Sequence, residues 1–428
     1  MSLLRQSLAA VIALALLGPA VAAETERVAL TADRLFDADS GQLRSNAVVV
    51  VEGERIVEVR SDGKVPEGVR RIDLGNATLL PGLIDCHVHI DWQSGDFNEQ
   101  ILRRSPIDQA VIAHVYARRT LDAGFTTVRN LGSSEFVDVA LRNAINRGEV
   151  PGPRILASGM ALGATGSHMD SGMGMSPYLH FDGFSGVADG VDAIRAKVRF
   201  NVKYGADVIK YAASAGVLSE EESVGDPQYS QDEMNAVVDE SHRWHRKVAA
   251  HAHGTEAIKM AVKAGVDSVE HGSMLDDEAI ALMKKHGTYL VADVYNDDYI
   301  LTEFARLKFP QSMIEKERKV GRVQRESFQR AVKAGVKIAF GTDAGVYPHG
   351  DNGKQFAKMT EWGQTPAQAL QAATVNAADL LGRKDQVGSL KAGLYADLIA
   401  VPGNPLEDIN LMQKVSFVMK GGKVEKEN

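Results

Sequence analysis

Five short strings, each ending an apolar run, constrain this chain more than any other feature. They are LIDCHVHI (83–90), DVIKYAAS (207–214), VAAHAHG (248–254), SVEHG (268–272) and IAFGTDAG (338–345). Each places a histidine, lysine or aspartate where a β-strand is expected to give way to a loop. A fold that brings these strand ends together would gather several metal-ligating side chains at one site.

Eight strand-like segments alternate with helical stretches through the middle of the chain. Continuous apolar strands separated by helices predict a parallel sheet covered on both faces, and eight such repeats favour a closed α/β (β/α)8 TIM barrel over an open sheet. The strands are expected at 79–89, 126–131, 154–159, 207–212, 248–252, 267–272, 289–293 and 337–343. Helices are expected at 106–123, 136–147, 189–204, 231–246, 255–264, 276–286, 312–334, 353–363 and 366–382.

The two flanks of the chain have a different pattern. Residues 27–78 and 387–428 are rich in alternating β-like segments with glycine turns. We therefore expect a small β-sandwich domain formed by both chain ends, 24–80 and 385–428, around a barrel domain at 81–384. In a barrel the loops that follow the strands build the active site.

Residues 1–23 have the features of a secretory signal peptide. Arg5 provides the positive n-region, an apolar stretch follows, and 20–22 (AVA) supplies the small residues of a cleavage site. The mature protein is therefore expected to be exported, periplasmic or secreted, and not membrane-bound. The formal net charge of −8 disfavours a nucleic-acid partner. The single cysteine, Cys86, excludes an intramolecular disulfide and is expected to pack in the core.

Four candidate ligands have one natural interpretation each. His87 and His89 share one face of a strand because side chains alternate with period two, and His271 ends another strand. Asp343, in the string GTDAG, ends the last strand. Together with Lys210 and His251 they suit two divalent metal ions and predict metal-assisted hydrolysis. Asp343 would also be catalytic, because it can accept a proton and pass it to the departing amine.

Lys210 has three possible roles. A lysine at this position can be a Schiff-base nucleophile, a salt-bridge donor, or a carboxylated lysine whose carbamate bridges two metal ions. Its ammonium form cannot ligate a metal, whereas a carbamate offers oxygen to both ions. The histidines expected on neighbouring strand ends favour the N6-carboxylated form.

His251 and His253 leave an ambiguity, because both lie on one face of the same strand. If His251 is the metal ligand, His253 lies one step further out and can contact substrate. If His253 is the ligand, then His253 and Glu256 form an HxxE pair like that of mononuclear deaminases. The first assignment is favoured because Gly254 and Thr255 are typical of the turn into a helix.

Two further residues are candidates for the substrate pocket. His168 follows the third strand and can donate a hydrogen bond to a developing oxyanion, which makes it a catalytic and substrate-binding candidate. Tyr229 precedes a helix and is a candidate contact for a substrate carboxylate. The strings show no acidic group placed to bind a basic substrate, so an apolar or aromatic leaving amino acid is expected.

These residues, together with 80–85 (LPGLID) and 392–397 (AGLYAD), resemble the amidohydrolase superfamily. Within it the chain looks similar to the imidazolonepropionase-related branch, which includes metallocarboxypeptidases that cleave Xaa-Pro or Xaa-Lys/Arg dipeptides and amidohydrolases that hydrolyse ochratoxin A to phenylalanine. The resemblance implies a binuclear zinc site bridged by carboxylated Lys210, a hydroxide nucleophile and a homo-oligomer.

The expected function is therefore that of an exported binuclear metal-dependent amidohydrolase. Its substrate would be a small N-acyl amino acid or dipeptide, cleaved as by a carboxypeptidase, with ochratoxin A as one candidate. A mononuclear deaminase or cyclic-amide hydrolase is the alternative among enzymes. A non-catalytic periplasmic binding protein is the alternative from another class.

Overall fold

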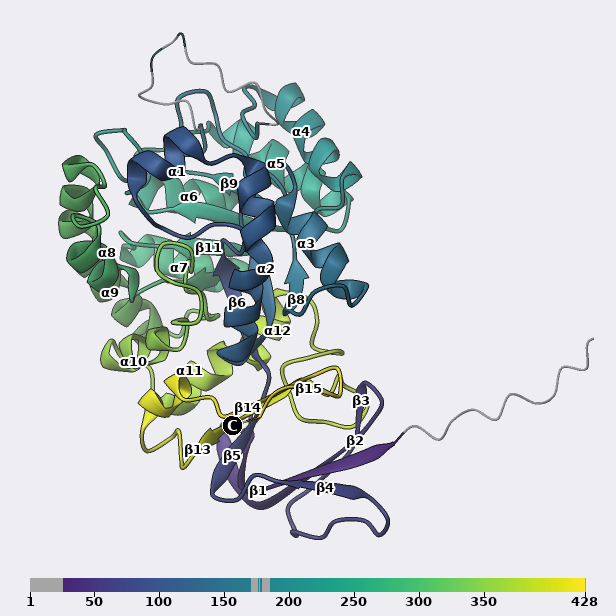
Figure 1. Ribbon diagram of the computed structural model, residues 1–428. Helices are drawn as coiled ribbons and strands as arrows, with labels where there is room; N and C mark the ends of the chain where they lie inside the picture. The colour runs from purple at the N-terminus through teal and green to yellow at the C-terminus, as the bar shows by residue number, and fades with distance from the viewer. Residues whose placement is uncertain (1–25, 171–175, 177, 179–184, 428) are drawn as a thin grey trace, which may run out of the picture.

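The computed structural model describes residues 26–170, 176, 178 and 185–427, so the expected signal peptide lies outside the described residues. Both flanks of the chain contribute to one sheet, which lies below the larger α/β part in Figure 1. Its strands are β1 (Arg27–Asp37), β2 (Gln42–Glu52), β3 (Arg55–Arg60), β4 (Arg70–Asp73), β5 (Ala77–Pro81), β13 (Leu398–Pro402), β14 (Phe417–Lys420) and β15 (Lys423–Glu427).

Hydrogen bonding joins these strands into a single sheet. The order is β15-β14-β13-β5-β1-β2-β3, with β4 paired to β1. The two flanks meet where β13 runs antiparallel to β5, with Ile399 opposite Leu80. The strands of both flanks share one apolar core, which includes Leu30, Val49 and Phe417. The two flanks therefore form one β-rich unit, and its form as a β-sandwich stays a prediction.

Gly82 marks the junction between this sheet and the α/β part. The expected strand at 79–89 is divided there into β5 and β6 (Leu83–Val88). A Cβ at Gly82 would lie 2.1 Å from Thr126 Oγ1, so only glycine lets the backbone pass this close to the neighbouring strand.

The α/β part contains two parallel sheets. One consists of β6, β7 (Phe125–Asn130) and β8 (Arg154–Leu156). The other consists of β9 (Val208–Ala212), β10 (Lys247–Ala252), β11 (Ser268–His271) and β12 (Tyr289–Val291). These seven strands fall within the ranges that the sequence predicts, apart from shifts of one residue at an end.

Backbone hydrogen bonds bridge both gaps between the two parallel sheets. After β8, Leu162 N donates to Lys210 O and Ala212 N donates to Leu162 O, each at 2.8 Å. The predicted eighth strand, 337–343, forms isolated bridges instead of a continuous ladder. It nevertheless connects the two sheets, because Leu290 N donates to Lys337 O and Cys86 N donates to Phe340 O, both at 2.8 Å.

Helices follow most of these strands and surround them in Figure 1. They are α1 (Phe97–Arg103), α2 (Pro106–Asp122), α3 (Val137–Asn146), α4 (Val191–Lys203), α5 (Gln231–Arg243), α6 (Thr255–Ala264), α7 (Asp277–His286), α8 (Asn296–Glu303), α9 (Gln311–Ala334), α10 (Lys354–Glu361), α11 (Pro366–Ala372), α12 (Val375–Leu380) and the 3-10 helix η1 (Ile409–Gln413). The expected helix 366–382 is two helices, because Thr374 has a non-helical backbone (φ −132, ψ −98). Within the described part of the chain, no helix has the length and apolar character needed to cross a membrane.

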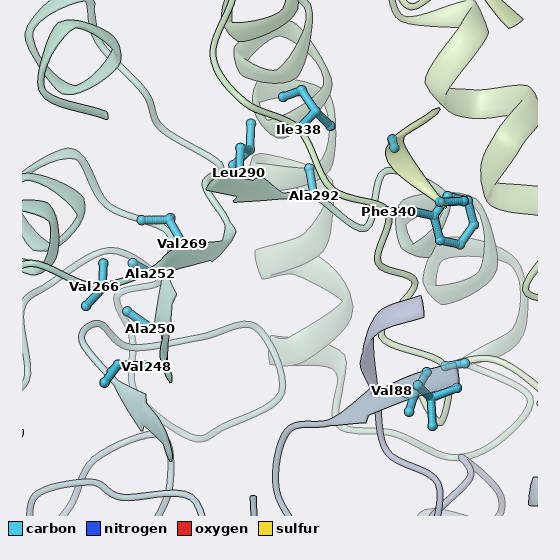
Figure 2. Close-up of a cluster of buried hydrophobic side chains, with 14 of the residues drawn as sticks. Val88, Val248, Ala250, Ala252, Val266, Val269, Leu290, Ala292, Ile338 and Phe340 are labelled. Atoms are coloured by element: carbon cyan, nitrogen blue, oxygen red, sulfur yellow. The ribbon is translucent and has the colours of Figure 1, made fainter. Parts of the chain in front are cut away.

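The alternation of side chains along β10 separates core from site. Figure 2 shows Val248, Ala250 and Ala252 in an apolar cluster that also contains Val269 and Leu290 of neighbouring strands. The intervening residue His251 therefore points to the other face of the strand. Cys86 is fully buried, which confirms its predicted place in the core.

Candidate active site

The strand ends bring predicted ligands from opposite parts of the chain together. His87 Nε2 lies 3.3 Å and His89 Nε2 lies 3.0 Å from the same atom, Asp343 Oδ1. His271, at the end of β11, offers a ring nitrogen to this group, and the ligand atoms of His87, His271 and Asp343 all lie within 4.8 Å of one another. Two histidines and a carboxylate in this arrangement form a donor set that suits a divalent ion such as Zn²⁺.

A second donor group adjoins the first. The ring nitrogens of His251, His253 and His271 also lie within 4.8 Å of one another, so His271 belongs to both groups. The His251 ring centroid is 4.6 Å from that of His271, and the His253 ring is stacked on His271 at the same distance. Two donor groups that share a residue can hold two neighbouring ions.

Lys210 lies buried beside these groups. Its side chain is 1 % exposed, and its Nζ has no hydrogen-bond partner in the described residues. Burial lowers the pKa of Lys210 to about 8, against the opposing charges of Glu270 and Asp343. The orphaned His251 Nε2 is a buried polar atom that a bound metal ion would satisfy, whereas Lys210 Nζ could take part only after conversion to a carbamate.

The backbone is strained at two of the candidate ligands. His271 and Asp343 have φ values of +67° and +56°, in the left-handed region that non-glycine residues rarely adopt. Such conformations persist where the surrounding structure enforces them, and they concentrate at functional sites. Here the Asp343 amide donates to His87 O at 2.7 Å, which ties two ligand-bearing segments together.

Asp293, Asn296 and Gln324 support the ligands from the side of α8 and α9. Asp293 Oδ1 lies 2.9 Å from His271 Nδ1, and Gln324 Nε2 donates to the same oxygen at 2.6 Å. Asn296 Nδ2 donates to Asp293 Oδ2 at 2.5 Å and to Asp343 Oδ2 at 3.2 Å. Burial alone would raise the pKa of Asp293, but the His271 charge and hydrogen bond hold it at about 2. Carboxylate contacts of this kind fix the orientation of a ligating imidazole.

A buried ion pair lies beneath His87. Arg129 and Glu270 are 1 % and 0 % exposed, and Arg129 Nη2 lies 2.9 Å from Glu270 Oε1. The other carboxylate oxygen, Oε2, is 3.0 Å from His87 Nδ1. Neither His87 Nδ1 nor Glu270 Oε2 has a hydrogen-bond partner within the described residues, so these two atoms lie close together without forming a hydrogen bond. The ion pair nevertheless places a negative group next to a candidate ligand.

His168 reaches the same site from the loop after β8. Its ring stacks on His251 with centroids 4.1 Å apart and planes at 19°. His168 Nδ1 lies 2.7 Å from Ser219 Oγ. Burial and the neighbouring cationic groups lower the pKa of His168 to about 3, so the ring is neutral around pH 7.

The other predicted residues have different outcomes. His253 lines the cavity described below, and its Nδ1 lies 2.7 Å from Ser273 Oγ. Tyr229 does not line it: its side chain is buried, and its hydroxyl donates to Ala188 O at 2.9 Å. The predicted substrate contact at Tyr229 is therefore corrected to a packing role. Glu256 is exposed in the first turn of α6 and also lies outside the cavity lining, which disfavours the HxxE arrangement.

A cavity of about 680 Å³ opens above the ligands. All six predicted metal ligands line it, together with His168 and His253. Its walls include apolar side chains from several loops and helices, which are Trp92, Met160, Leu218, Ile300, Val320 and Val346. The lining also contains many polar and charged side chains, and a concave site in which such groups converge is the usual form of a small-molecule site.

Asp293 could have been predicted from the sequence. It comes directly after the apolar run 289–292, in the same way as the other candidate residues end apolar runs. Asn296, Gln324 and Glu317, which also line the cavity, lie on helices α8 and α9. A single sequence does not indicate that residues of these two helices line the same cavity as the strand ends.

Comparison with known proteins identifies the class. Residues 78–424 match the amidohydrolase family, so the chain belongs to this family and is a hydrolase of amide bonds. Ochratoxinase of Aspergillus niger is 33% identical over 434 residues, covering 95% of this chain and 89% of the fungal protein. These matches confirm the resemblance stated from the sequence.

Two solved structures are also similar. A crystal structure of a Xaa-Pro dipeptidase with bound methionine in its active site has a TM-score of 0.88 and 39% identity, and covers 93% of this chain and 99% of that one. A prolidase complexed with N-methylphosphonate-L-proline has a TM-score of 0.87 and 33% identity, with coverages of 94% and 100%. Such neighbours imply a TIM barrel with an accompanying β-rich domain.

Proposed function

We propose that this protein is a binuclear metal-dependent amidohydrolase that removes the C-terminal amino acid from a small dipeptide or N-acyl amino acid. The observation that carries the proposal is the pair of donor groups sharing His271, in a cavity that the buried, unpartnered Lys210 also lines. The likeness to a Xaa-Pro dipeptidase and to ochratoxinase supports the choice of amide and of leaving group.

His87, His89, His251, His271 and Asp343, together with N6-carboxylated Lys210, would hold two Zn²⁺ ions. Carboxylation requires a neutral amine, which the lowered pKa of Lys210 makes accessible. Bound metal ions at such a site supply an activated water molecule and polarise the scissile carbonyl.

Asp343 is suited to move the proton. One of its oxygens faces His87 and His89, while the other accepts from Asn296, which fixes the plane of the carboxylate. It would accept a proton from the attacking water and deliver it to the departing nitrogen. His168 would donate a hydrogen bond from Nε2 to the developing oxyanion. In the neutral tautomer that carries its proton on Nε2, Nδ1 accepts a hydrogen bond from the Ser219 hydroxyl.

Three further properties belong to the same proposal. The hydrogen bonds between the parallel sheets support a closed (β/α)8 barrel. The signal-like residues 1–23 support export to the periplasm or medium. A homo-oligomer remains an expectation from the family resemblance.

The test is a hydrolysis panel with the zinc-loaded mature protein, read by mass spectrometry of free amino acids. The panel contains Xaa-Pro, Xaa-Arg and Xaa-Phe dipeptides, N-acyl amino acids and ochratoxin A. We expect release of the C-terminal amino acid from at least one class, abolished by a chelator. The Asp343→Asn variant, prepared identically, controls for contaminating peptidases. No release from any member would contradict the proposed function.

A further inference from the structure

Helix α9 presents a carboxylate to the cavity that the proposed chemistry does not use. Glu317, Val320 and Gln324 line the cavity together, because residues three, four and seven apart share one face of a helix. The position of this face is fixed by close packing against α8. A Cβ at Gly321 would lie 2.2 Å from Asp297 Oδ1, so only glycine allows the two helices to approach this closely.

Glu317 is 4 % exposed, and within the described residues its carboxylate has no hydrogen bond or ion pair. The cationic groups nearby have other partners. Lys316 Nζ donates to the carbonyl oxygens of Gly216, Ser219 and Glu221 at 2.6 to 3.0 Å. Arg325 pairs with Asp297 at 2.9 Å and Asp298 at 3.0 Å.

The surroundings of Glu317 make an unpaired charge costly. Ile300, Val320 and Leu218 are apolar side chains that line the same cavity as Glu317. Burial, with Asp297 and Asp293 adding negative charge, raises the pKa of Glu317 to about 8. A buried carboxylate without a partner loses its hydration and gains no compensating interaction. A cation beside it would offset both this loss and the repulsion from Asp293 and Asp297.

We propose that Glu317 binds a positively charged group of the substrate, an alkylammonium or guanidinium, inside the cavity. This inference rests on the proposed function and narrows it to small amides that carry a cation. The sequence had predicted a pocket without an acidic group for a basic substrate, because only the residues at strand ends were considered there. The position of Glu317 replaces that prediction. The cation has two possible sources, which are the free α-ammonium of a dipeptide and a basic side chain.

Matched substrate pairs separate these sources. Ala-Lys and Ala-norleucine differ in the charge of the side chain, while Ala-Phe and propionyl-Phe differ in the α-ammonium. The variant is Glu317→Gln, and the control is Glu315→Gln, an exposed glutamate two residues away on the same helix. The measurement is the ratio of kcat/KM within each pair.

We expect the wild type and Glu315→Gln to prefer the charged member of one pair, and Glu317→Gln to lose roughly 30-fold or more of that preference. The pair affected identifies the source of the cation. Equal ratios in the wild type and Glu317→Gln for both pairs would overturn the inference, including the case in which a protonated Glu317 only donates a hydrogen bond.

Calorimetric binding of the same compounds gives a readout that is independent of turnover. If no compound is hydrolysed, the proposed function fails, but a charge preference in binding that Glu317→Gln removes still supports the inference. Equal binding of charged and neutral members to the wild type would overturn it. Thermal melting of the three proteins checks that a lost preference is not a loss of folding.

Discussion

Lys210→Ala is expected to abolish hydrolysis while leaving the protein folded. Removing this proposed ligand should lower metal content by about one ion per chain and reduce kcat/KM by roughly 10³-fold or more, because bound metal contributes several kcal/mol of transition-state stabilisation. Folding should survive, since Nζ makes no hydrogen bond within the described residues. Activity assays and elemental analysis of the purified variant measure the two effects.

The control for this substitution is Lys203→Ala, an exposed lysine at the end of α4, which should change neither quantity. A short carboxylic acid such as propionate can occupy the space of the missing side chain and supply bridging oxygens. It is therefore expected to restore part of the activity of Lys210→Ala. Full metal content and full activity in Lys210→Ala would show that the lysine is not a ligand.

Arg129→Met is expected to be strongly destabilising. The substitution leaves Glu270 as an uncompensated charge inside the protein, which costs about 3–5 kcal/mol of the free energy of unfolding. It also removes the hydrogen bonds that Arg129 donates to Cys86 O and to Ser268 Oγ. Denaturant unfolding followed by circular dichroism measures the change.

The double variant Arg129→Met/Glu270→Met tests the cause. If the uncompensated charge is responsible, the double variant should be more stable than Arg129→Met alone, because both charges are replaced by apolar groups of similar volume. A double variant that is less stable than the single one would instead attribute the loss to packing. Metal content of the double variant further reports on whether Glu270 helps to hold His87.

Residues at strand ends were predictable because two simple rules place them. Side chains alternate along a strand, and the carboxyl ends of parallel strands meet at one edge. His87, His89, His251, His271 and Asp343 lie at or near the ends of the predicted strands, whereas Lys210 lies in the middle of β9, and all six line the cavity. The long helix predicted at 312–334 is likewise confirmed as α9, ending at the left-handed Gly335.

The remaining features depend on contacts that are distant in sequence. Glu317 and Gln324 reach the cavity only because α9 packs on α8. Tyr229 does not line the cavity, because its hydroxyl donates a hydrogen bond to the backbone oxygen of residue 188. The single mixed sheet of the two flanks arises from the pairing of β13 with β5, which alternation within each segment does not specify.

The number of metal ions that activity requires tests the central claim most directly. Protein stripped of metal by a chelator is titrated with Zn²⁺ in the presence of the substrate identified by the panel, and amino acid release is measured after each addition. We predict no activity without metal and a plateau at two equivalents per chain. Full activity of the metal-free protein, or a plateau at one equivalent, would contradict a binuclear amidohydrolase.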